Sequence, residues 1–362
     1  MKKVIGIAAA LLLTVSSCDN EFSVNDEWSD VTVVYSLLDA AADTNWVRIE
    51  RGYLGNRPAN ESFGVADSFY YKDVTAYLLG YKDNGKFGKA DLVDSLYLTK
   101  DETSRKLELG VFTQDGYHLY RTTETLDDEL VYRLKVEKEN ADAPVAMATT
   151  KLLAVGTGFS DFGIKTPRPV SFPRIYSQAI EWYTSDNATI YQVEMEFWYK
   201  EFNCTTKQEE LKSILMDIST VSGIQAQGSG GFVKLQLRYA ALYDMISNRL
   251  EPIEDGYLRF FDQFKIFVHA GGEDLEKYMI LNQPNDGVGQ DKPEFPGIEN
   301  GTGLFSSRTS TEMEDIELNA EQLGKYYKTA SLCELGFAVA ESGDTFRCEI
   351  QGNAPTKVKV QK

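Results

Sequence analysis

The feature that most constrains the fold is a strict alternation of apolar and polar residues over residues 190–200, IYQVEMEFWYK. One side of an extended chain then carries only large apolar side chains, those of Tyr191, Val193, Met195, Phe197 and Tyr199. A period of two is typical of a strand with one buried face, whereas a helix would scatter these side chains around its axis. Residues 130–137, LVYRLKVE, have the same pattern. The chain is therefore expected to be built mainly from sheets that bury one face.

The first part of the chain repeats this strand signal between polar turns. Strands are expected at residues 32–38, 45–55 and 73–81, the last leading into the turn KDNGKFG at 82–88. Several short strands of this kind predict an antiparallel, immunoglobulin-like β-sandwich over residues 29–155.

A change in composition separates this region from the second half. Residues 156–174 hold three prolines and three glycines without any period, which predicts a linker or crossover. Residues 175–362 are expected to form an α+β domain with an antiparallel sheet and a few helices.

The second half mixes strand and helix patterns. Thr206 and Glu209 match a capping box, and Leu211 and Ile218 belong to a helically spaced apolar series that Gly223 would end, which predicts a helix. The other elements expected are strands at 232–239, 256–270, 332–340 and 344–350, and helices at 240–249 and 272–281.

The amino terminus has the layout of a bacterial lipoprotein signal. Lys2 and Lys3 precede an apolar run of about ten residues, too short to span a bilayer, and the run ends in VSSC at residues 15–18. We expect residues 1–17 to be a signal peptide, Cys18 to be acylated, and 18–28 to be a tether. The alternative is an ordinary secreted protein with a chance cysteine near the cleavage site. Two or three acyl chains would anchor the body durably, each buried CH₂ contributing about 0.8 kcal/mol.

The charge of the chain excludes one class of partner. The formal net charge is -18, and a body this acidic repels phosphate backbones, so nucleic acid is not expected as a partner. Cations, basic patches and neutral sugars are compatible with this charge.

The remaining cysteines allow one disulfide. Cys333 and Cys348 flank two expected strands around the turn ESGD, so they could form a bridge or remain two buried thiols. Cys204 would be an unpaired apolar filler.

Motifs of enzyme chemistry are scarce. His118 and His269 have no metal-ligand spacing, and the chain has no GxSxG elbow and no phosphate-binding glycine motif. We expect no metal, no cofactor and no nucleotide. Carboxylate-based glycoside hydrolysis stays open, since it needs only two acids about 5 to 9.5 Å apart.

Two features suggest contact with a ligand or partner. The glycine-rich stretch 282–308 is expected to be a long loop, with Asn300, Gly301, Gly303 and Phe305 as candidate contacts. The alternative is a surface crossover that apolar residues, Phe305 among them, pin to the body.

Two tryptophans are the second such feature. Trp198 projects from the polar side of its strand, and Trp182 precedes the turn TSDN, so the two indoles could form a stacking platform for sugars. The alternative is a second packed layer that buries them.

Three stretches together resemble a family of uncharacterised outer-membrane lipoproteins of Bacteroidota, classed as a domain of unknown function. They are VVYSLLDAAADTNWVRIERGYLG, YQVEMEFWYKE, and YMILNQPN leading to PGIENGTGLFSSR. The family's late motif usually reads N-I-E-x-G-x-G-[IL]-F. It is matched here by Ile298, Glu299, Asn300, Gly301, Gly303, Leu304 and Phe305, with Gly297 where asparagine is common.

The resemblance implies location and company more than chemistry. Such lipoproteins resemble the accessory proteins of TonB-dependent outer-membrane transporters, and the DNE that follows Cys18 is similar to acidic tags of surface-exposed lipoproteins. The expected function is a non-enzymatic, lipid-anchored accessory to an outer-membrane β-barrel, facing the cell exterior. The alternatives are a surface module that binds glycan or another nutrient, and a carboxylate-based hydrolase.

Overall fold

The computed structural model describes residues 31–52, 69–86, 89–104, 115–139, 141, 144–154, 162–165, 169, 177–223, 231–282, 297–317, 335–337, 339–341, 344–351 and 354–359. For residues 84–86, 89, 339–341, 344–351 and 354–359 it describes the backbone alone. Two separate apolar cores organise these residues, one in each half of the chain.

The first half is the expected β-sandwich. One layer is a five-stranded sheet in the order β15-β8-β7-β3-β4. Its strands are β3 (Val74–Lys86), β4 (Lys89–Tyr97), β7 (Val131–Lys138), β8 (Ala146–Lys151) and β15 (Ile298–Glu299). The facing layer contains β1 (Val31–Leu38), β2 (Asn45–Gly52), β5 (Thr99–Asp101) and β6 (Leu119–Thr122). Val34 and Ile49 from one layer and Leu78 and Leu134 from the other share one core, so the layers pack face to face.

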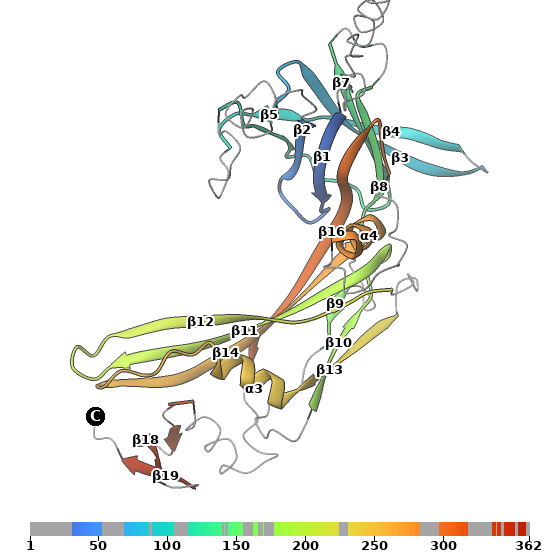
Figure 1. Ribbon diagram of the computed structural model, residues 1–362. Helices are drawn as coiled ribbons and strands as arrows, with labels where there is room; N and C mark the ends of the chain where they lie inside the picture. The colour runs from blue at the N-terminus through green and yellow to red at the C-terminus, as the bar shows by residue number, and fades with distance from the viewer. Residues whose placement is uncertain are drawn as a thin grey trace, which may run out of the picture.

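The second half is built on long strands. Four of them, β11 (Ala188–Asn203), β12 (Glu209–Val221), β14 (Tyr257–Gly272) and β16 (Gly301–Ile316), form one end of an eight-stranded sheet in the order β12-β11-β14-β16-β1-β2-β6-β5. Figure 1 shows β11, β12 and β14 extending together to one side of the molecule. The expected strand at 190–200 is confirmed, since the apolar side chains of β11 are buried in alternation.

Smaller elements cover the inner face of these strands. They are the sheet β13 (Phe232–Arg238), β10 (Ser177–Tyr183) and β9 (Gly163–Ile164), and the helix α3 (Tyr239–Ser247). Helix α4 (Glu273–Asn282) follows β14, and β17 (Val339–Glu341), β18 (Asp344–Gln351) and β19 (Ala354–Lys359) form a separate sheet. The predicted helices at 240–249 and 272–281 are confirmed, and the α+β character of this half with them. No helix among the described segments is long and apolar enough to cross a membrane.

Strand β16 joins the two halves, and its position shows that the predicted loop and the predicted domain boundary were both partly wrong. Its first part pairs in parallel with β1 and its second part pairs antiparallel with β14; Figure 1 shows it running from the sandwich toward the long strands. Residues 298–299 and 301–308 are therefore strand rather than loop. The first of them complete the sandwich, so the predicted boundary at residue 155 does not separate the halves fully. Residues 283–296 of the predicted loop lie outside the described part of the chain.

The glycines of this segment serve close packing. A Cβ atom on Gly303, whose φ is 121°, would lie 2.0 Å from the carbonyl oxygen of Val34, and one on Gly301 would lie 2.6 Å from that of Thr32. Only glycine permits this approach of β16 to β1.

The predicted helix beginning at Thr206 is wrong, because that segment forms strand β12. Asn203 accepts hydrogen bonds from the backbone N–H groups of Thr205 and Thr206, both at 2.9 Å, and so fixes a turn where a helix cap was expected. The chain then returns along β11 as a hairpin, with Ile214 and Met216 buried against the core.

Candidate functional site

The outer face of the long strands carries an exposed apolar cluster that we call the Trp198 patch, made of Trp198, Leu211 and Leu215. Leu211 is 51% exposed and Leu215 53% exposed on β12, the last strand of its sheet. In the β11–β12 register Trp198 lies opposite Ser213, between the two leucines. The three side chains therefore lie on one face within reach of one another.

Charged side chains surround the patch and orient the indole. The Nε1–H of Trp198 donates to the carboxylate of Glu196 at 2.7 Å, and the Nζ atom of Lys265 lies 5.2 Å from the centroid of the indole ring. Lys265 also pairs with Glu314, and this hydrogen bond raises the pKa of Lys265. Lys200, beside the patch on β11, pairs with Asp262 at 2.8 Å. The indole is thus held in place while its surroundings keep both signs of charge.

A row of polar side chains crosses the same face farther along the strands. The Nδ1 atom of His269 lies 2.8 Å from Ser310 Oγ, its Nε2 atom lies 3.2 Å from a carboxylate oxygen of Glu194, and its ring stacks on Phe267. The order serine, histidine, carboxylate is that of a hydrolytic triad. Ser310 is exposed on an open sheet face, however, which does not exclude water from a bound substrate. We interpret the row as a cross-strand bridge.

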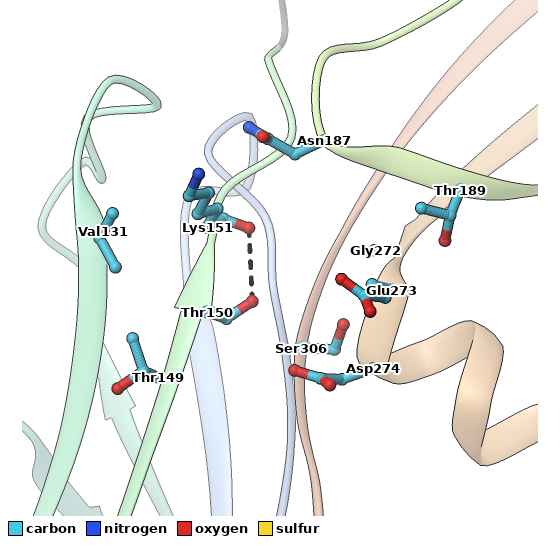
Figure 2. A pocket seen from close by; sticks show the side chains of 10 residues that line it. All are labelled: Val131, Thr149, Thr150, Lys151, Asn187, Thr189, Gly272, Glu273, Asp274 and Ser306. Carbon is cyan, nitrogen blue, oxygen red and sulfur yellow. Dashed lines mark hydrogen bonds between the residues drawn. The ribbon is translucent and has the colours of Figure 1, made fainter. Parts of the chain in front are cut away.

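A second feature is the junction pocket, which lies where β8 and β7 of the sandwich meet the ends of β11 and β14 (Figure 2). Its volume is about 370 Å³. It is lined by Val131, Thr149, Thr150, Lys151, Asn187, Thr189, Gly272, Glu273, Asp274 and Ser306.

Side chains of the second half fix the walls of the junction pocket against β8 and the residues after it. Ser307 Oγ donates to the carbonyl of Lys151 at 2.6 Å, Asn187 Nδ2 to that of Leu152 at 2.9 Å, and Ser185 Oγ to that of Ala154 at 2.8 Å. The pocket wall is therefore held by hydrogen bonds that satisfy backbone acceptors.

The beginning of α4 supplies the acidic side of the pocket. Burial raises the pKa of Asp274, and the nearby charge of Lys277 partly offsets this. Glu273 pairs with Lys277 at 2.7 Å, and Ser306 Oγ accepts a hydrogen bond from the backbone N–H of Leu275 at 3.2 Å. Glu273 and Asp274 are consecutive at the start of α4, and both line the junction pocket on the side that faces β8 (Figure 2).

Several residues predicted to be contacts lie inside the protein. Trp182 is fully buried beside Tyr191, so the expectation of a stacking platform that includes it is wrong. Trp198 is half-buried on the outer face, as its strand parity indicated. Gly303 and Phe305 are buried where β16 meets the sandwich, and they do not present a contact surface.

The other predicted site residues are distributed as follows. Gly301 is half-buried and packs against Thr32, which leaves no room for a ligand there. Asn300 is exposed, with its side-chain amide donating to the carbonyl of Pro144 at 3.3 Å. Cys18 and Cys333 lie outside the described residues, and Cys348 is described in its backbone alone, so the lipid anchor and the disulfide stay predictions.

Metal chemistry has no candidate in the described ranges, where no three His, Cys, Asp or Glu side chains gather to hold an ion. His118 is 3% exposed, and its Nδ1 atom lies 2.7 Å from the carbonyl oxygen of Gly116. Its Nε2 atom is buried without a hydrogen-bond partner, and burial lowers its pKa. The histidine is therefore neutral in the folded state near neutral pH.

Comparison with known proteins assigns no family. No protein-family model and no curated protein matches the chain. Among solved structures, the C-terminal globular domain of an oligosaccharyltransferase from Pyrococcus abyssi is 8% identical, with a TM-score of 0.23, over 66% of this chain and 46% of that one. The FN1–FN3 domains of chicken CNTN1 are 11% identical, with a TM-score of 0.23, over 80% of this chain and 67% of that one. These scores are too low to support an argument, and the chain spans less than half of the first structure.

Proposed function

We propose that this protein is a lipid-anchored accessory protein of the bacterial outer membrane that binds an outer-membrane β-barrel of a TonB-dependent transporter complex. It acts without catalysis and faces the cell exterior. The observation that carries the proposal is the Trp198 patch, an exposed apolar cluster at the edge of a long sheet.

The composition of the patch fits a protein-binding surface. Interfaces commonly place an aromatic residue at the centre, apolar neighbours beside it and a polar rim around it. Trp198 and the two leucines supply the centre, and Lys265 and Glu196 supply the rim. Because the indole is already fixed in the free protein, less side-chain entropy is lost when a partner binds.

The lipid anchor would hold this surface near its partner. Cys18 precedes the first described strand residue, Val31, by thirteen residues. An extended tether of that length reaches on the order of 45 Å. The folded part of the protein would therefore remain within that distance of the membrane, where the local concentration of a membrane partner is high.

Affinity purification from mildly solubilised membranes tests the proposal. We expect the wild-type protein to recover a β-barrel partner and the double variant Leu211→Ser with Leu215→Ser to recover at least about tenfold less, since apolar interface residues carry most of the affinity. The matched control is Leu92→Ser with Val93→Ser on β4, where the side chains are 54% and 56% exposed at the edge of the other sheet. Equal recovery by both double variants, or no barrel with the wild type, would refute the proposal.

A further inference from the structure

We propose that the β-barrel partner attaches by adding an extended segment of its own chain, as a further strand, to the free edge of β12. This inference rests on the proposed function, and it names how the partner is held and which residues its segment carries. In strand addition, main-chain hydrogen bonds give affinity and alternate side chains give specificity. A closed barrel has no strand edge to offer, so the segment would come from one of its loops.

Strand β12 has an unpaired edge. In the described part of the chain it ends the eight-stranded sheet and pairs only with β11, and Figure 1 shows it along the margin of the long strands. With thirteen residues it is the longest of the described strands that end a sheet, and at roughly 3.3 Å per residue it offers about 40 Å of backbone. The N–H and C=O groups that face away from β11 form a row to which another strand can pair.

The middle of this edge lacks the usual protection against strand addition. Natural edge strands are commonly protected by proline or by a lysine that projects into solvent. Residues 209–221 contain no proline, and their single lysine is Lys212. Its Nζ atom lies 2.6 Å from the carboxylate of Glu201, and in the register Lys212 lies opposite Tyr199 of the inner face. Residues 213–216 carry no charge, so the centre of the edge is open to a partner strand.

The outer face of β12 selects the residues of the added segment. Leu211 and Leu215 are exposed on this face, and the exposed acids Glu209 and Asp217 lie on either side of them with the same strand parity. Opposite charges directly across a strand pair stabilise it, and like charges destabilise it. A matching segment therefore has apolar residues opposite the leucines and a basic residue opposite each acid. The order acid, leucine, leucine, acid selects the same pattern in a parallel or an antiparallel segment.

The same pattern disfavours a second copy of this chain as the added strand. Two copies of β12 could pair antiparallel about Ser213, which would place Leu211 of each copy opposite Leu215 of the other. That register also places Glu209 opposite Asp217 at both ends, so two pairs of like charges would face each other. The formal net charge of -18 adds repulsion between copies. A partner segment with basic residues fits the edge better.

Binding of a synthetic strand tests the inference without a barrel. The probe is the labelled peptide Lys-Thr-Leu-Thr-Val-Thr-Leu-Thr-Lys, titrated by fluorescence anisotropy with the full chain carrying Cys18→Ser. We expect saturable binding. Two further peptides carry N-methyl groups on one or the other set of alternate residues. Only one set has its N–H groups toward β12, so one methylated peptide should bind like the parent and the other at least about tenfold more weakly.

Charge variants test the selection of basic residues. Glu209→Lys with Asp217→Lys should weaken binding of the parent peptide at least about fourfold, since two attractive cross-strand pairs become repulsive. The matched control is Asp43→Lys with Glu124→Lys, which makes the same change in net charge at two exposed positions of the first half. Its affinity should stay within about twofold of the parent chain, because separated surface charges are screened.

Three results would overturn the inference. They are no binding of the parent peptide, equal binding of the two methylated peptides, and self-association that protects the amides of β12 from hydrogen exchange as the chain concentration rises. The first two refute strand addition even if affinity purification recovers a barrel, and the third makes a second copy the occupant. Peptide binding with the expected asymmetry but no recovered barrel would keep the strand-accepting edge and refute the barrel as its partner.

Discussion

Replacing Gly303 by alanine should separate β16 from β1 and so weaken the join between the two halves. Gly303 has φ of 121°, and the added Cβ atom would meet the Val34 backbone at 2.0 Å from its oxygen, 2.9 Å from its carbonyl carbon and 3.0 Å from its nitrogen. The unfavourable φ alone costs roughly 1 to 3 kcal/mol. Because the contacted atoms are backbone, the clash is relieved only if β1 moves, and the loss of two ladder hydrogen bonds adds roughly 1 to 3 kcal/mol.

We therefore expect Gly303→Ala to lower the free energy of unfolding by about 2 to 6 kcal/mol. Urea denaturation followed by circular dichroism measures this, and hydrogen exchange of the β1 amides shows whether the loss is located at the pair. Gly297→Ala is the matched control, because a Cβ atom there meets nothing within 4 Å. If Gly303→Ala stays within about 0.5 kcal/mol of the wild type, as surface substitutions do, the close approach of the two strands is wrong.

Three further predictions concern stability and anchoring. Arg259 is 2% exposed and pairs with Glu201 at 2.5 Å, and Lys212 pairs with the same carboxylate at 2.6 Å. Arg259→Ala therefore leaves Glu201 with Lys212 alone and should cost about 1.5 to 3 kcal/mol in a urea titration, as the loss of a charged hydrogen bond does, and an unchanged stability would contradict the buried pair. Because burial lowers the pKa of His118, the unfolded state binds a proton on this side chain at a higher pH than the folded state does. The stability that comes from the neutral His118 is therefore complete above about pH 6.5 and is lost as the pH falls below that value. His118→Gln should make the loss of stability in acid shallower. Cys18→Ser should abolish acylation and shift the protein from the membrane to the soluble fraction, and unchanged fractionation would argue against the lipid anchor.

Much of the fold was predictable because local patterns matched the buried faces. The alternation at 190–200 agrees with the burial of β11, and the turn-separated strands of the first half do form a sandwich. The helix prediction for residues 209–221 was wrong because their apolar residues fit both a period of two and a helical period. Pairing with β11 makes the segment a strand, and sequence spacing does not reveal that pairing.

The role of β16 could not be read from its own residues. Glycines that permit close backbone approach look the same in sequence as glycines of a loop, and the partner strand β1 lies far away in the chain. The burial of Trp182 could have been predicted, because Trp182 lies two residues from the apolar Ile180 and therefore on the same face of the strand, and Ile180 is buried too. The junction pocket carried no such signal, since five segments that are distant in the sequence combine to form it.

In vivo photo-cross-linking at residue 215 tests the proposed function most directly. With p-benzoylphenylalanine in place of Leu215, illumination of whole cells should join this protein to an outer-membrane β-barrel protein. The same residue in place of Leu92, which is equally exposed at 54%, should give no such adduct. Absence of an adduct at 215, or identical adducts from both positions, would contradict the assignment of the Trp198 patch as the surface that binds the barrel.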